Sequence, residues 1–164
     1  MQANELFDWP NTILLDGGMG TMLQAAGLKL GARPEELNIT DPALIESIHA
    51  RYAPYGALAA LDVGPLGELL EPNGTLAFED AVAEYGRIVR AGVAAGADLV
   101  FLETFTDLYE LKAALLAVKE NSSLPVLASM SFEAGGRTFT GCTVESFAAT
   151  ARGLGADAVG INCS

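Results

Sequence analysis

The stretch GLGADAVGINC, residues 153–163, repeats the pattern of AAGADLVFLET, residues 94–104. In both, a glycine that ends a helix is followed by Ala-Asp and then by an apolar strand with a polar end. A third helix end, APYGAL at residues 53–58, begins in the same way, but Leu58 stands where the aspartate would be. Repeated corners of this kind are typical of βα units. The sequence therefore predicts a parallel α/β sheet.

Strands and helices are expected to alternate along nearly the whole chain. Apolar runs predict five strands, at residues 13–15, 58–63, 97–105, 124–132 and 158–161. Amphipathic helices are predicted between them, at residues 19–26, 41–54, 75–96, 106–122 and 143–155. Asp41 and Asp107 are expected N-caps, and Glu110 would complete a capping box with Asp107. The length fits a single domain, residues 1–164.

Charge and composition exclude several classes of partner. The chain has 9 Lys and Arg against 21 Asp and Glu, a net charge of -12, which argues against binding to nucleic acid or to an anionic membrane. No apolar run approaches the length of a membrane span, and the amino terminus lacks a signal-peptide pattern. We therefore expect a cytoplasmic protein. Two cysteines, Cys142 and Cys163, are too few for a disulfide framework.

Polar residues with possible chemistry gather at the predicted carboxyl ends of strands, which meet at one mouth in parallel βα folds. They are Asp16, Gly17, Gly18, Asp62, Glu103, Ser129, Asn162 and Cys163. Glu103 is the sharpest signal, because a carboxylate at the end of an apolar strand is costly to bury without a cation or donors. The turn DGGMGT is otherwise read as a tight turn, being neither a P-loop nor a GxGxxG fingerprint. His49 is interpreted as a surface or packing residue, and Cys142 as a packing residue.

Six stretches in the same order carry a resemblance to a known family. They are ILLDGGMGTMLQ, RPEELNITDP, ALDVGPLGELLEPNGTLAFEDA, GADLVFLETFTDLYELKAAL, SFEAGGRTFTG and GLGADAVGINCS. Together they resemble the homocysteine S-methyltransferase family, most closely the homocysteine-binding module of cobalamin-dependent methionine synthases. The resemblance covers nearly the whole chain.

The resemblance implies a fold and a site. The family fold is an eight-stranded TIM-type (βα) barrel in which three cysteine thiolates hold a zinc that takes the homocysteine sulfur as fourth ligand. By this likeness Asp16 and Glu103 would hold the substrate ammonium group, and the amides of Gly17 and Gly18 its carboxylate. Ser129 and Asn162 would also lie at the substrate, and Cys163 would be the first zinc ligand. Cobalamin and methyltetrahydrofolate would act only through other modules.

The chain departs from the family pattern in two places. The family's second βα unit is missing at a joint near residues 56–58, and the later segment with the other two zinc-binding cysteines is absent. We therefore expect an incomplete barrel of about five parallel strands that binds zinc weakly, does not transfer methyl groups alone, and self-associates through open sheet edges. The alternatives are a non-catalytic scaffold that binds a small amino acid, and an unrelated βα enzyme that uses the glycine-rich turn for an anion.

Overall fold

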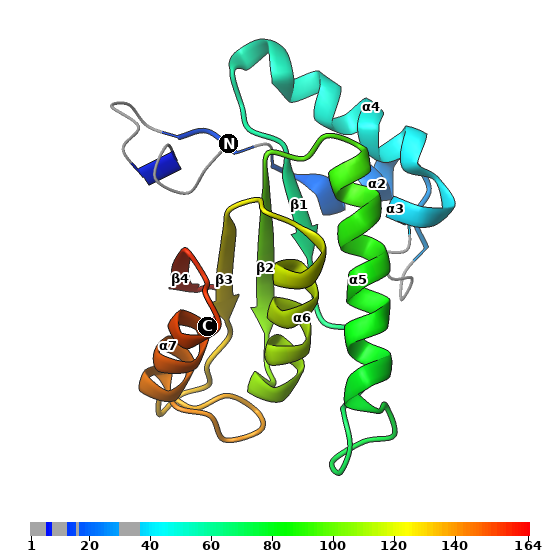
Figure 1. The fold of residues 1–164 in the computed structure, drawn as a ribbon. Coiled ribbons are helices and arrows are strands. Elements are labelled where there is room, and N and C mark those ends of the chain that lie inside the picture. Colours follow the sequence, from blue (N-terminus) through cyan, green and yellow to red (C-terminus); the bar gives the residue numbers. More distant parts are fainter. Residues whose placement is uncertain (1–5, 8–12, 16, 30–36) are drawn as a thin grey trace.

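A parallel sheet forms the centre of the fold. The computed structural model describes residues 6–7, 13–15, 17–29 and 37–164. Within them the sheet has four strands, in the order β1 (Ala60–Val63), β2 (Leu99–Phe105), β3 (Val126–Met130) and β4 (Ala158–Ile161). Each strand pairs in parallel with the next along the chain, and a helix lies in each connection (Figure 1). The predicted parallel α/β class is confirmed.

The helices form two groups. Three long helices belong to the crossovers: α5 (Phe78–Ala94), α6 (Leu108–Asn121) and α7 (Val144–Gly153). Helices α5 and α6 lie side by side, with α6 in front of β2 and α5 to the right of β1 (Figure 1). The elements near the amino terminus are α2 (Met19–Ala25), α3 (Leu37–Thr40), α4 (Pro42–Tyr52) and the 3₁₀ helix η2 (Ala53–Tyr55). Helix α4 lies above the amino-terminal ends of the strands, and α2 and α3 lie below it, beside the upper part of α5 (Figure 1).

The main hydrophobic core lies between the sheet and the crossover helices. Leu102 and Phe105 of β2 are fully buried there with Tyr85 of α5 and Leu111 of α6. Helix α5 comes especially close to β1, because a Cβ at Gly92 would lie 2.5 Å from a methyl carbon of Leu61. A side chain at position 92 would therefore push the helix away from the sheet.

The opposite face of the sheet carries a smaller apolar cluster. Leu6, Ala60 and Leu99 are its buried members, and Leu58 and Phe101 pack against them. A third cluster, built on Leu23, Ile45 and Ile48, holds α2 and α4 together. The amino-terminal helices thus have an apolar cluster of their own.

The repeated corners have the same hydrogen bonds. The Asp98 N–H donates to Ala59 O, and its carboxylate accepts from Ala59 N at 2.9 Å. Asp157 makes the same pair of bonds with Val126, where its carboxylate accepts from the N–H at 2.8 Å. At the third corner, the Leu58 N–H donates to Leu14 O at 2.8 Å, which reproduces the main-chain bond only.

Four of the five predicted strands need correction. Residues 13–15, expected as the first strand, contribute one isolated parallel bridge, from Leu15 to Leu58. The strands expected over 58–63, 97–105 and 124–132 are shorter, at Ala60–Val63, Leu99–Phe105 and Val126–Met130. Hydrogen bonding between β1 and β2 begins just after the corner, where the Asp98 N–H donates to Ala59 O.

The expected helix caps are confirmed in part. Asp41 accepts from the Leu44 N–H at 3.2 Å, and Asp107 accepts from the Tyr109 N–H at 3.0 Å. The capping box with Glu110 was wrong, because this carboxylate is buried and turns away from the helix start. It accepts from the Leu66 N–H at 2.7 Å and from the Tyr85 hydroxyl at 2.9 Å. Burial outweighs the local capping geometry here.

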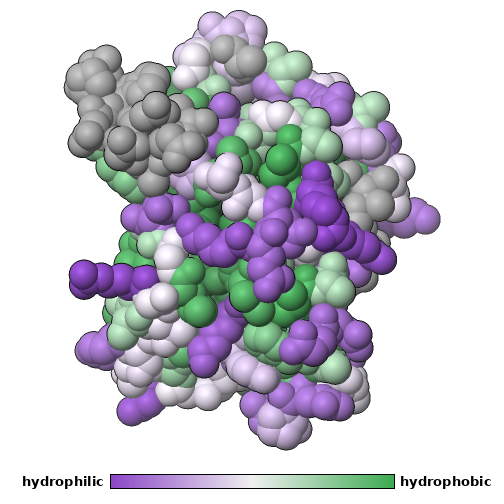
Figure 2. Space-filling model, in the orientation of Figure 1, coloured by the Kyte–Doolittle hydropathy of each residue, from purple (hydrophilic) through white to green (hydrophobic). Residues whose placement is uncertain are grey.

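Some hydrophobic side chains are exposed at the surface, notably on strand β4. On the side seen in Figure 2, hydrophobic residues reach the surface between hydrophilic ones. On β4, which pairs only with β3 in the described sheet, Val159 is 46% and Ile161 53% exposed. No helix in the described part of the chain has the length and hydrophobicity needed to cross a membrane.

Candidate functional site

A cavity of about 400 Å³ lies where the glycine-rich turn meets β1 and β2. Its lining includes Gly17 and Gly18 of the turn, Asp62 of β1 and Glu103 of β2. Three of the predicted substrate residues, Gly17, Gly18 and Glu103, are therefore brought together. Asp16, the fourth residue expected there, lies outside the described residues.

The turn has a backbone shape that favours glycine. Gly18 has a φ of 67° and is the N-cap of α2. Its carbonyl accepts from the Thr21 hydroxyl at 2.8 Å and from the Met22 N–H at 3.0 Å. A Cβ at position 18 would lie 3.3 Å from the Thr21 hydroxyl oxygen. Both the positive φ and the close contact explain why a glycine stands here.

Glu103 gives the cavity an acidic wall with a perturbed carboxyl. The residue is half-buried, and this burial raises its pKa above the ordinary value. Asp62, exposed on the neighbouring strand, lines the same cavity. A bound cation would offset the free-energy cost of desolvating the Glu103 carboxylate. The arrangement therefore suits a ligand that has an ammonium group and a second polar group that can contact the main chain.

Ser129 and Asn162 lie in an adjacent cluster that joins three strands. The Asn162 Oδ1 accepts from the Ser129 hydroxyl at 2.8 Å and from the Thr104 N–H at 3.2 Å. Its Nδ2 donates to the Thr104 hydroxyl at 2.7 Å. The Ser131 hydroxyl donates to the Asn162 main-chain oxygen at 2.9 Å. Neither Ser129 nor Asn162 lines the cavity.

Cys163 follows this cluster directly. Its side chain is exposed, its φ is 53°, and its Sγ lies 3.6 Å from the Asn162 Nδ2. Cys142, the other cysteine, is half-buried, donates to Thr143 O at 3.2 Å and has a pKa raised by burial. Among the described residues, no three His, Cys, Asp or Glu side chains form a metal-binding group. A catalytic zinc takes three protein ligands, so these residues alone do not fit one.

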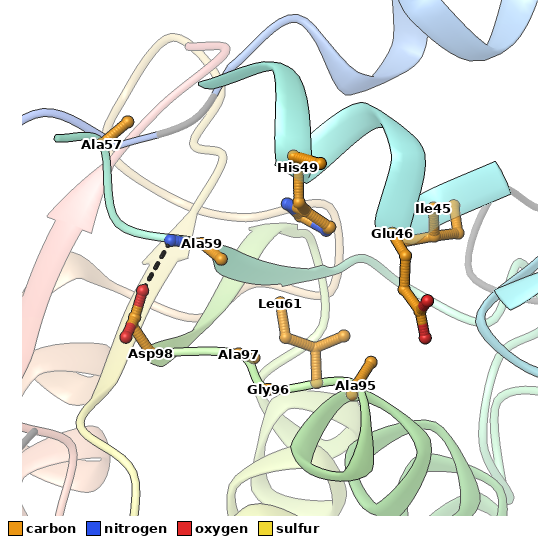
Figure 3. Close-up of a pocket in the computed structure, with 12 residues that line it drawn as sticks. Ile45, Glu46, His49, Ala57, Ala59, Leu61, Ala95, Gly96, Ala97 and Asp98 are labelled. Atoms are coloured by element: carbon orange, nitrogen blue, oxygen red, sulfur yellow. Dashed lines mark hydrogen bonds between the residues drawn. The ribbon is translucent and has the colours of Figure 1, made fainter. Parts of the chain in front are cut away.

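A second cavity, of about 380 Å³, lies at the amino-terminal ends of the strands. His49 and Glu46 of α4 reach toward it, opposite Ala59, Leu61 and the corner before β2 (Figure 3). Asp98 also lines it, but its carboxylate is engaged with the Ala59 N–H. His49, interpreted from the sequence as a surface or packing residue, is half-buried at this wall.

Sequence reasoning found most of the cavity but missed one element of its construction. Asp62 was recognised as a strand-end acid and does line the cavity with Glu103. The φ of 64° at Thr104, which follows Glu103 at the strand end, was not predicted. A β-branched residue in this conformation has no sequence signature, because its backbone is set by tertiary contacts.

Comparison with known proteins points to one family. The sequence model described as homocysteine S-methyltransferase matches residues 13–61 and 56–164. The methionine synthase of Mycobacterium tuberculosis (strain ATCC 25618 / H37Rv) is 26% identical over 208 residues, covering 91% of this chain, and that of Mycobacterium leprae (strain TN) is 27% identical over the same share. The chain spans only 17% of the length of these relatives.

Solved structures share the fold. The homocysteine methyltransferase MmuM from Escherichia coli matches in its metallated form with a TM-score of 0.70 and 21% identity, over 96% of this chain and 76% of that one. Its apo form gives a TM-score of 0.68 and 22% identity, over 96% and 74%. The carboxyl transferase domain of Rhizobium etli pyruvate carboxylase gives a TM-score of 0.54 and 16% identity, over 75% and 19%. At these identities the likeness concerns the fold alone.

Proposed function

Because the chain belongs to the homocysteine S-methyltransferase family, we propose that it is a homocysteine-binding module for methyl transfer to the homocysteine thiol. The observation that carries this proposal is the cavity that joins the glycine-rich turn to Glu103. It combines an acidic wall for an ammonium group with main-chain polar groups for a carboxylate, the two ends shared by α-amino acids.

In the proposed complex, Glu103 holds the homocysteine ammonium group together with Asp16. The backbone at Gly17 and Gly18 holds the carboxylate, and the absence of Cβ atoms there lets the ligand approach closely. Asp62 adds a second negative charge to the wall. The support is the placement of Gly17, Gly18 and Glu103 around one cavity.

The methyl-transfer chemistry of the family needs a deprotonated homocysteine sulfur, which zinc coordination supplies. We propose Cys163 as one zinc ligand, since its thiol is exposed beside the strand-end cluster. The remaining ligands would come from outside the described residues. Residues 1–164 would therefore bind the amino-acid part of homocysteine without catalysing methyl transfer, which is the behaviour of a non-catalytic binding scaffold. Cobalamin and methyltetrahydrofolate would enter only through other modules.

We propose further that the family's second βα unit is missing near residues 56–58. The family model matches in two segments that overlap at residues 56–61. The alignment with the M. tuberculosis relative spans 208 positions, whereas 91% of 164 residues is about 149, so about 59 positions have no partner in this chain. The direct bridge from Leu15 to Leu58 supports the same reading.

Self-association through the sheet edge is also proposed. Strand β4 has a neighbour on one side only in the described sheet, and Val159 and Ile161 are exposed on it. Unpaired edges of this kind pair readily with other chains. Light scattering over a range of concentrations tests this, and a monodisperse monomer throughout would contradict it.

Calorimetry with homocysteine tests the proposed function. We expect binding without added zinc, weakened at least about tenfold by Glu103→Gln, because the ammonium group loses its charged partner. Asp80→Asn is the matched control, since it removes a carboxylate in the first turn of α5, away from the lining residues. Preference for inorganic phosphate over homocysteine would instead indicate an anion site at the glycine-rich turn. Tight, stoichiometric zinc with methionine formation would refute the proposed lack of activity.

A further inference from the structure

Strand β2 contains a bulge beside the cavity. Leu102 pairs with Ala128 and Phe105 pairs with Met130, so β2 has one residue more than β3 between these two pairs. Regular alternation would turn position 105 to the same face as Glu103. Instead Phe105 is fully buried in the main core, with its ring centroid 6.1 Å from that of Tyr85. The extra residue allows Glu103 to line the cavity while Phe105 packs on the helix side.

The bulge places Thr104 in a strained conformation. Its φ of 64° is in the left-handed region, which β-branched residues rarely adopt. Such a conformation persists only where surrounding contacts stabilise it. The Asn162 side chain makes two hydrogen bonds to Thr104, accepting from its N–H and donating to its hydroxyl.

We infer that Asn162 is a positioning residue that stabilises the bulge at Thr104 and thereby directs Glu103 into the cavity. Asn162 reaches Thr104 across β3, from the end of β4, and Ser129 of β3 donates to the same amide oxygen. The hydrogen-bonding capacity of its side chain is taken up inside the protein. Oδ1 accepts two bonds, and Nδ2 donates one to Thr104 and contacts the Cys163 Sγ. This assigns Asn162 an indirect role in place of the substrate contact expected from the sequence.

The first test is a double-variant cycle of thermal stability. Asn162→Ala removes the bonds that stabilise the strained residue, and we expect it to lower the Tm by about 5–10 °C. Thr104→Gly alone relieves the positive φ but removes the acceptor of the hydrogen bond from the Asn162 Nδ2, and we expect a net decrease in Tm that is smaller than that of Asn162→Ala. In the Asn162→Ala background that bond is already absent, and glycine relieves the positive φ. We therefore expect the double variant to melt at or above the Tm of Asn162→Ala. Two losses that add would overturn the inference.

The second test separates positioning from general stabilisation, and it rests on the proposed function. Asn162→Ala should weaken homocysteine binding at least about tenfold at a temperature where the variant is fully folded, although Asn162 does not line the cavity. Asn121→Ala is the control, because the Asn121 side chain, at the end of α6, also joins two elements by hydrogen bonds: it accepts from Arg90 of α5 and donates to Ala117 O. It should lower the Tm and leave homocysteine affinity unchanged.

The outcomes distinguish the two proposals. If the unchanged chain binds homocysteine and Asn162→Ala binds it equally well, the positioning role is wrong and the proposed function stands. If the unchanged chain does not bind homocysteine, the proposed function fails. The stability cycle then decides by itself whether Asn162 holds the bulge.

Discussion

The corners before β2 and β4 differ from the corner before β1 in one bond. All three form a main-chain bond to the preceding strand or segment, but only Asp98 and Asp157 add a carboxylate that accepts the neighbour's N–H. Leu58 has no polar side chain to do so. The part of the chain after Leu58 consists of regular βα units, whereas residues 13–15 are attached by one bridge. At the corner before β1, the main-chain bond without a carboxylate is thus accompanied by a single bridge and not by a paired strand.

The largest expected effect tests whether these two parts unfold together. Phe105→Ala leaves a cavity in the main core, and we expect it to lower the free energy of global unfolding by about 3–5 kcal/mol. Leu23→Ala empties a buried site in the separate cluster of α2 and α4. Hydrogen exchange should then show lost protection in α2 and α4, with sheet amides unchanged. Equal loss of sheet protection in both variants would show that the chain is one cooperative unit.

The stability of the part after Leu58 should also depend strongly on one buried carboxylate, that of Glu110. Glu110 accepts from the Leu66 N–H and the Tyr85 hydroxyl, so it links the loop after β1 to α5 and α6. Glu110→Ala would leave both donors without this acceptor. We expect a loss of roughly 2–4 kcal/mol in the free energy of unfolding, measured by chemical denaturation. If Glu110→Ala lowers the free energy of unfolding by less than an alanine substitution at an exposed position does, water has replaced the carboxylate as the acceptor.

The buried Glu110 carboxyl group should also make the free energy of unfolding depend on pH. Burial raises the pKa of Glu110 above its ordinary value of 4.5, so the folded state binds its proton more tightly than the unfolded state. Stability relative to Glu110→Gln should be greatest below about pH 4.5 and should fall as the pH rises through the raised pKa. Denaturation of both proteins across this range measures it. A difference that grows with pH would mean that the ionised form is the one stabilised.

The sequence predicted the regular part of the fold well and the irregular parts less well. Glycine stops, apolar runs and the aspartate corners are local signals, and they located β2, β3, β4 and the long helices. Glu110 was assigned to a capping box because the spacing from Asp107 fits one, while the burial that overrides it depends on Leu66 and Tyr85. The cavity was predicted through strand ends. The bulge at Thr104 was not, because it depends on Asn162, which is 58 residues away.

A smaller effect is expected at the aspartate corners themselves. Asp98→Ala and Asp157→Ala should each cost about 1–2 kcal/mol, because a main-chain N–H loses its acceptor. Asp41→Ala is the control, since Asp41 also accepts one main-chain N–H but does so at the start of α4. It should reduce protection of α4 without changing the stability of the sheet. If Asp98→Ala and Asp157→Ala lower the free energy of unfolding no more than an exposed alanine substitution does, the aspartate carboxylates do not stabilise these corners.

The smallest effect is expected where the corner is incomplete. By analogy with Asp98 and Ala59, Leu58→Asp would offer a carboxylate to the N–H of Leu14, whose carbonyl already accepts from Leu58. The same change removes an apolar side chain that packs against Leu6, Ala60 and Leu99. Each effect is about 1 kcal/mol and they oppose each other, so the net change in unfolding free energy should stay within about 1 kcal/mol. The informative measurement is hydrogen exchange at residues 13–15. Greater protection there at unchanged global stability would show that the aspartate is what secures a segment to the sheet, whereas lower protection would show that apolar packing alone holds it.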